Sequence, residues 1–157
     1  MVRLIGEDRT EQKLIDDIAT HGWHWIHIPA DGAHVGYAFT VGLFQSYGHP
    51  ELIVVGLPGQ VAGEMLAICA HAARSGSPID RTHPTDALLE SGSCEFAEVP
   101  ASAYLEYVGY ALWYYEKQPF PLYQIAWPSR DGLFPWHPDA AASFRQAQPV
   151  IGVPPKS

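Results

Sequence analysis

The segment from Trp23 to Leu43, WHWIHIPADGAHVGYAFTVGL, decides the fold class. Residues 23–28 predict a strand, because β-branched and aromatic residues are frequent in it and Pro29 with Ala30-Asp31-Gly32 follows as a turn. Residues 35–43 predict a second strand, and the connection between the two is too short for a crossover helix. We therefore expect an antiparallel hairpin, and with it an α+β fold rather than a doubly wound parallel sheet.

The second strand of this hairpin alternates between large and small side chains. Its large residues share one face, and its small residues, which include Ala38 and Thr40 between Gly36 and Gly42, share the other. A face of small residues allows either a helix or a ligand to approach the sheet closely. The sequence leaves both alternatives open, and Thr40 is therefore a candidate binding residue.

The remaining pattern predicts three helices and further strands. A helix over residues 9–21 is indicated by Asp8 as N-cap, by Glu11 at the capping-box spacing and by Gly22 as a left-handed stop. Its apolar stripe is Leu14, Ile15 and Ile18. The other helices are expected over residues 59–74 and from 102 to about 116. Further strands are expected at residues 52–55, 95–99 and 122–127, with a short return strand at 133–136.

Each of the two later helices shows an apolar stripe. The stripe of the 59–74 helix consists of Val61, Met65, Ile68, Cys69 and Ala72, and that of the 102–116 helix of Leu105, Val108, Leu112 and Tyr115. The expected architecture is an antiparallel or mixed sheet with about three helices packed against it.

The size and composition suit one soluble domain. The chain has 157 residues, of which 47% are hydrophobic, so residues 1–157 can form a single domain with a core over about 8–151. A loose, Pro-rich tail is expected at 152–157. No apolar run approaches the roughly 18 residues of a membrane span, and the N-terminus lacks a signal-peptide pattern. Cys69 and Cys94 both lie in apolar surroundings, which favours a reducing, cytoplasmic location.

The charge argues against a nucleic-acid partner. The formal net charge is −8, with 17 acidic and 9 basic residues, and the basic residues do not cluster. We therefore expect no nucleic-acid partner. No membrane partner is expected either, because no apolar run is long enough for a membrane span. No glycine-rich phosphate loop is present, so no cofactor is expected, and a flavin-binding small barrel lacks a phosphate-binding signal. The oligomeric state is not indicated.

The eight histidines suggest a metal site only weakly. His21, His24 and His27 cannot bind one ion together, because His24 and His27 point to opposite faces of a strand and His21 lies too far from His27. A metal would need His24 or His27 together with His49 or Glu51, and a zinc site requires three or four converging ligands. We predict no metal.

The turn His49-Pro50-Glu51 places an imidazole and a carboxylate two residues apart. Such a pair can act as a catalytic base and its orienting group. In the structural alternative, His49 bonds a backbone carbonyl and Glu51 caps a helix or pairs with Arg130. Gln124 has an amide that, if buried, needs partners that a ligand can supply.

These residues define a predicted site between strands 36–43 and 122–127. The predicted catalytic residues are His49 as base or acid and Glu51 as its orienting group. The predicted substrate-binding residues are Thr40, Gln124, Trp127 and Trp136. The expected function is small-ligand binding or acid–base catalysis on a small polar or peptidic substrate. The alternative is a non-enzymatic, accessory or immunity-like protein-interaction module that uses the Trp-rich C-terminal segment.

Several segments also resemble a known family. They are HGWHWIHI, GYAFTVGLFQSYGHPELIVVGLP, YQIAWPSRDGLFPWHP and the late Gln148-Pro149. Together they are similar to a bacterial domain-of-unknown-function family, number 4262, over about residues 21–151. That family has Tyr in place of Phe39, Asp in place of Ser129 and an acid in place of His137. The resemblance implies one coherent domain with a shared site region, and it implies no reaction.

Overall fold

A five-stranded mixed sheet forms the centre of the computed structural model, which describes residues 1–155. Its strands lie in the order β1-β2-β3-β5-β4, and only β3 and β5 are parallel. The predicted α+β class with a mixed sheet is confirmed. The strands are β1 (His24–Ile28), β2 (Tyr37–Val41), β3 (Glu51–Val55), β4 (Glu95–Glu98) and β5 (Leu122–Ala126).

The predicted hairpin forms the β1–β2 edge of this sheet. The two strands pair antiparallel, with Trp25 opposite Thr40 and His27 opposite Ala38. Strand β2 then pairs antiparallel with β3, so that Phe39 lies opposite Ile53. β3 therefore lies between β2 and β5, and the two strands predicted to enclose a pocket are not neighbours.

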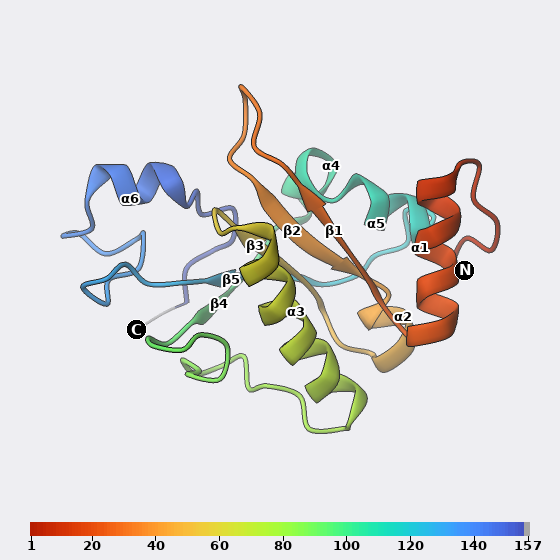
Figure 1. The fold of residues 1–157 in the computed structure, drawn as a ribbon, viewed down its shortest axis with the longest axis horizontal. Coiled ribbons are helices and arrows are strands. Elements are labelled where there is room, and N and C mark those ends of the chain that lie inside the picture. Colours follow the sequence, from red (N-terminus) through yellow and green to blue (C-terminus); the bar gives the residue numbers. More distant parts are fainter. Residues whose placement is uncertain (156–157) are drawn as a thin grey trace.

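Helices cover both faces of the sheet (Figure 1). One core contains side chains of α1, α4 and α5, and the second contains side chains of α3. In Figure 1, α3 crosses in front of the sheet, and α4 and α5 lie behind it. The helices are α1 (Arg9–His21), α2 (Leu43–Tyr47), α3 (Gly59–Arg74), the 3-10 turn η1 (Ala101–Ala103), α4 (Tyr104–Tyr107), α5 (Gly109–Tyr114) and α6 (Ala142–Ala147).

Helix α1 has the bounds and caps that its sequence predicts. The Asp8 carboxylate accepts a hydrogen bond from the backbone N–H of Glu11 at 2.8 Å, and Gly22 ends the helix with a φ of 90°. The stripe of Leu14, Ile15 and Ile18 is buried. Each of these side chains contributes roughly 1.5–3 kcal/mol through removal of apolar surface from water.

The small-residue face of β2 is covered by a helix rather than by a ligand. Ala38 lies in the core that α3 shares with the sheet. α3 in turn approaches β1 closely, because a Cβ added at Gly63 would lie only 2.7 Å from the Trp25 ring. The predicted burial of Ile68 on α3 is wrong: its side chain is 39% exposed, and Leu66 is buried instead.

Several local predictions differ from the structure. The segment before His49 forms the short helix α2, which was expected to be strand and turn. The helix expected from 102 to 116 is broken at Val108, whose φ of −124° and ψ of 47° are not helical. As a result Leu105 is 83% exposed instead of buried. Residues 133–136 form no strand, since 133–134 are irregular and 135–136 lie in a turn, and α6 was not predicted.

Part of the tail that was expected to be loose is bound to the sheet. The backbone N–H groups of Ile151 and Gly152 donate to the Gln124 side chain at 2.9 and 3.1 Å. Val153 pairs with Glu98 as an isolated bridge. Residues 154 and 155 are exposed and have no regular structure, and residues 156–157 of that prediction lie outside the described residues.

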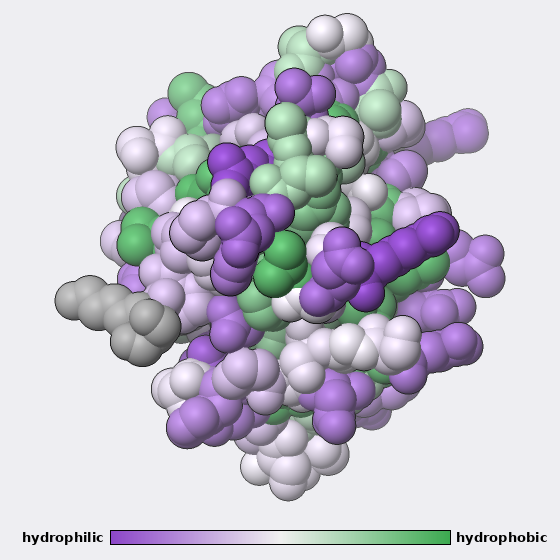
Figure 2. All heavy atoms as spheres, turned by 90° about the vertical axis from the view of Figure 1, so that its left-hand side faces the viewer, coloured by the Kyte–Doolittle hydropathy of each residue, from purple (hydrophilic) through white to green (hydrophobic). Residues whose placement is uncertain are grey.

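The outer surface carries mixed polar and apolar side chains. On the face that bears α6, apolar areas are small and separated by polar ones (Figure 2). Within residues 1–155, no helix combines the length and the apolar character that crossing a membrane requires.

Candidate functional site

Glu51 is fully buried and accepts five hydrogen bonds. Three come from the backbone N–H groups at the start of α2, those of Gly42, Leu43 and Phe44, at 3.0–3.2 Å. The other two come from the hydroxyls of Thr40, at 2.8 Å, and Tyr115. The carboxylate therefore caps α2, which is the structural alternative that the sequence left open.

All five partners of Glu51 donate hydrogen bonds to its carboxylate. The Thr40 hydroxyl accepts from the N–H of Leu52, and the Tyr115 hydroxyl accepts from that of Gln45, so both hydroxyl protons point to Glu51. Burial raises the pKa of Glu51, and the hydrogen bonds oppose that shift. The five donors therefore favour the ionised carboxylate and work against the cost of its burial.

His49 is buried and both of its ring nitrogens are occupied. Nδ1 lies 2.7 Å from the carbonyl oxygen of Pro50, and Nε2 lies 3.2 Å from Nη1 of Arg81. A carbonyl can only accept and a guanidinium can only donate, so His49 is the neutral tautomer with its proton on Nδ1. Burial lowers the pKa of His49, and the nearby Arg81 charge lowers it further.

Gln124 and Trp127 serve the attachment of the C-terminal segment. The Gln124 amide donates to the carbonyl of Pro149 at 2.9 Å, in addition to the two bonds it accepts. Gln148 is fully buried and bonds both the N–H and the C=O of Trp127, at 3.0 and 2.7 Å. The Trp127 indole donates to Val55 at 2.8 Å. The partners that a ligand was expected to supply for Gln124 therefore come from the chain itself.

The predicted convergence of His49, Glu51 and Gln124 is wrong. His49 contacts Arg81, whose guanidinium lies over the ring of Tyr123. Gln124 follows Tyr123 on the same strand and so points to the opposite face of the sheet. The three side chains have separate sets of partners, and β3 occupies the space where the pocket was expected. Thr40, also predicted to line that pocket, is fully buried in the Glu51 network.

Two of the predicted site residues line separate hollows. His49 lines one of about 290 Å³ together with Tyr47 and Arg81, and Trp136 lines another. Its ring stacks on Phe134 with centroids 5.0 Å apart. The hollow at Trp136 measures about 320 Å³ and also includes Arg81 and Glu95.

A further hollow, which the sequence did not predict, lies between α1, the β1–β2 hairpin and the α4–α5 segment. We call it the aromatic hollow; it measures about 410 Å³. Five aromatic rings and two carboxylates line it, together with Ile28, Leu105 and Gly109. The aromatic residues are Tyr37, Phe39, Tyr107, Tyr110 and Trp113, and the acidic residues are Glu11 and Glu106.

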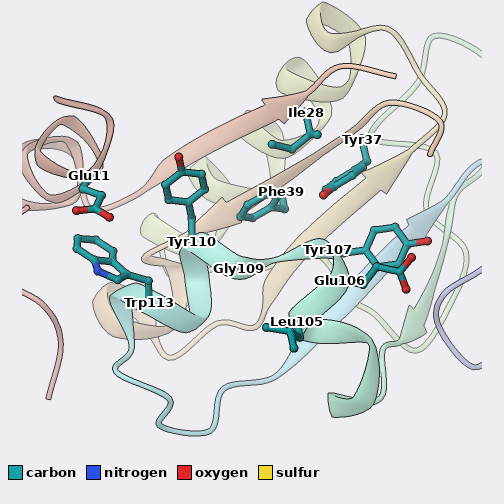
Figure 3. Close-up of a pocket in the computed structure, with 10 residues that line it drawn as sticks. All are labelled: Glu11, Ile28, Tyr37, Phe39, Leu105, Glu106, Tyr107, Gly109, Tyr110 and Trp113. Atoms are coloured by element: carbon teal, nitrogen blue, oxygen red, sulfur yellow. The ribbon is translucent and has the colours of Figure 1, made fainter. Parts of the chain in front are cut away.

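The two carboxylates lie at opposite ends of the aromatic hollow (Figure 3). Glu11 projects from α1 beside Trp113, and Glu106 lies beside Tyr107. Glu106 is paired with His34, whose Nε2 lies 2.7 Å from its carboxylate. Glu11 accepts only the backbone N–H of Glu7, at 2.7 Å, and no cationic side chain within residues 1–155 forms an ion pair with it.

A sequence signal for this hollow does exist. Tyr107, Tyr110 and Trp113 follow one another at intervals of three residues, which places aromatic rings on one side of a helical segment. In the structure these three rings line the hollow together with residues of the β1–β2 hairpin. The sequence interpretation assigned this segment to the core through a different stripe and so missed the hollow.

Metal-ligating residues do not cluster in the described chain. Within residues 1–155 no group of three or more His, Cys, Asp or Glu side chains is arranged to hold a metal ion. His24 instead pairs with Asp17, at 2.7 Å from Nδ1 to the carboxylate.

Comparisons with known proteins identify one family. Its sequence profile, described as "Domain of unknown function (DUF4262)", matches residues 17–141. No curated protein and no solved structure shows significant similarity to the chain. The match includes the hairpin, the Glu51 network and the α4–α5 segment, and it begins after Glu11. Because it covers most of the sequence, the chain belongs to the DUF4262 family.

Proposed function

We propose that this chain is a small-ligand-binding domain and that its aromatic hollow binds an organic cation with an apolar body, such as a primary amine. One observation carries the proposal: the Glu11 carboxylate lies beside a set of aromatic rings and has no cationic partner within residues 1–155. Aromatic faces attract cations through their quadrupole, and a nearby carboxylate adds direct charge attraction.

The dimensions and chemistry of the hollow support this ligand class. A ligand cation near Glu11 would contact Trp113 and Tyr110, and its apolar part would extend along Phe39 toward Tyr37. Trp113 already accepts one cation of the chain, because the Arg3 guanidinium lies 5.3 Å from its ring centroid. No lysine or arginine lines the hollow, so an anionic ligand would meet two carboxylates and no compensating charge.

The proposal concerns binding rather than turnover. The residues that line the hollow offer carboxylates and phenols but no serine, cysteine or histidine. The imidazole and carboxylate at positions 49 and 51 form no acid–base pair. Binding is therefore the function that the geometry supports best.

Calorimetric titration with three probes of one skeleton tests the proposal. We expect 2-phenylethylamine to bind with a dissociation constant on the order of 1 mM, equivalent to about −4 kcal/mol. The neutral 2-phenylethanol should bind about fivefold more weakly, and phenylacetate should not bind in this hollow, because only the amine gains cation–π and carboxylate contacts.

The variant Glu11→Gln tests whether the Glu11 charge contributes to amine binding. It keeps the side-chain shape and should weaken amine binding about three- to fivefold, the range of a partly exposed ion pair. Glu64→Gln makes the same charge change at an exposed position of α3 and should leave the affinity unchanged. Equal affinities for amine and alcohol, or equal losses in both variants, would contradict the proposal.

A further inference from the structure

Arg81 is a guanidinium that the fold orients but does not neutralise. Its Nη1 donates to Nε2 of His49 at 3.2 Å, and its carbon atom lies 5.4 Å from the ring centroid of Tyr123. Its Nε is buried and has no hydrogen-bond partner within residues 1–155. No carboxylate of these residues lies within ion-pair distance of it.

Without an anion, the burial of the Arg81 guanidinium costs folding free energy. A buried polar atom without a hydrogen bond loses its contact with water and gains nothing in return. Among the described residues 1–155, the one direct hydrogen-bond partner of the guanidinium is His49, a neutral acceptor. Its Nδ1 bond to Pro50 keeps Nε2 directed at Arg81. His49 is therefore a positioning residue for Arg81. Its burial and tautomer, which gave no support to acid–base chemistry, are explained by this role.

The hollow beside Arg81 has a second feature that points to a ligand. Phe134 and Trp136 stack at an interplanar angle of 7° and form an apolar wall. The same hollow of about 320 Å³ contains Thr82 and His83, together with Phe96 at the sheet. Asp80 holds both loop residues in place, because its carboxylate accepts from Oγ1 of Thr82 at 2.6 Å and lies 2.9 Å from Nδ1 of His83. Glu95 also lines it and is the one carboxylate there among residues 1–155. Burial raises the pKa of Glu95.

We propose that this hollow, defined by Arg81, Thr82, Phe134 and Trp136, is a binding site for a small carboxylate with an aromatic or other planar apolar body. The carboxylate binds the guanidinium, whose planar array of donors matches two oxygens. The apolar body packs against the Phe134–Trp136 wall. The site is separate from the aromatic hollow and binds a ligand of opposite charge, so it does not depend on the proposed function.

The experiment uses 3-phenylpropionate as probe and the indole N–H signals of the ¹⁵N-labelled protein as readout. The Trp136 signal is assigned with Trp136→Phe. Adding 3-phenylpropionate should shift the Trp136 signal saturably, with a dissociation constant on the order of 1 mM. The neutral 3-phenylpropionamide should bind about tenfold more weakly, because it cannot form the charge-assisted bonds.

Matched variants assign the charge to Arg81. Arg81→Gln should weaken 3-phenylpropionate binding about tenfold or more, and Arg74→Gln, the same change at an exposed position at the end of α3, should not alter it. Arg81→Lys keeps the positive charge and replaces Arg81→Gln in the experiment if the glutamine variant unfolds. It should bind more weakly than the wild type, because an ammonium cannot pair with both carboxylate oxygens in the planar geometry.

Three outcomes would overturn the inference. These are equal binding of the acid and the amide, an Arg81→Gln or Arg81→Lys variant that binds as the wild type does, and a probe that shifts other indole signals but not that of Trp136. Glu11→Gln should leave 3-phenylpropionate binding unchanged, and Arg81→Gln should leave 2-phenylethylamine binding unchanged. The two proposed binding sites are therefore tested independently of each other.

Discussion

Replacing Glu51 with alanine is expected to lower the free energy of unfolding by about 3–5 kcal/mol, the cost of removing one partner from a buried charged network. The substitution leaves three backbone N–H groups at the start of α2 and the hydroxyls of Thr40 and Tyr115 without their acceptor. Each of these donors stays buried without an acceptor and so keeps the free-energy cost of its desolvation. The space that the glutamate side chain leaves has room for at most a few water molecules. For a chain of this size the midpoint of thermal unfolding should fall by roughly 6–20 °C.

Urea unfolding followed by circular dichroism measures this change. Glu64→Ala is the matched control, because it removes the same side chain from an exposed position on α3 and should change stability by less than about 0.5 kcal/mol. Glu51→Gln should lie between the control and Glu51→Ala, since its amide offers one acceptor and places a donor against the others. If Glu51→Ala is as stable as Glu64→Ala, the structural assignment of Glu51 is wrong.

Replacing Ile18 with aspartate is expected to cost a similar amount, about 3–5 kcal/mol. Ile18 is buried on α1 within the core that the helix shares with β2 and α5, and it packs against the backbone at Gly42. An aspartate there loses the apolar contacts of the isoleucine and buries a carboxylate with no partner. The aspartate should be less harmful at low pH, because protonation removes the buried charge.

The neighbouring Ala19 supplies the control for this prediction. Ala19→Asp adds the same charge to the same helix turn on an exposed side. It should cost under about 1 kcal/mol, mainly through the unfavourable dipole at a helix C-terminus. Thermal unfolding curves of the two variants at pH 7 compare them directly. Similar melting temperatures would show that α1 does not pack through Ile18.

The sequence predicted helix α1 and the β1–β2 hairpin because the residues that determine them are close together in the chain. The caps at Asp8 and Gly22 lie within or next to the helix they bound, and α1 was predicted with its observed bounds. The β1–β2 hairpin followed from a connection too short for any other geometry. The capping role of Glu51 remained one of two alternatives, because its partner α2 was interpreted as strand and turn.

The sites themselves depend on contacts between distant segments. The aromatic hollow combines α1, the hairpin and residues 105–113, and no single stretch contains its pattern. Arg81 belongs to a loop whose sequence is polar and irregular, and only the fold brings it to His49. Gln124 was correctly selected as a buried amide in need of partners, but those partners follow 25–28 residues later in the sequence.

The most direct test of the account is to map 2-phenylethylamine binding on the backbone amide spectrum of the ¹⁵N-labelled protein. The account predicts saturable shifts concentrated at the amides of Tyr107, Gly109, Tyr110 and Trp113, with Gln124 and Arg81 unaffected. Titration with 2-phenylethanol should give smaller shifts at the same amides. Shifts that cluster around His49 and Gln124 instead, or a spectrum that does not respond to the amine at concentrations well above 1 mM, would contradict the assignment of the aromatic hollow as the ligand site.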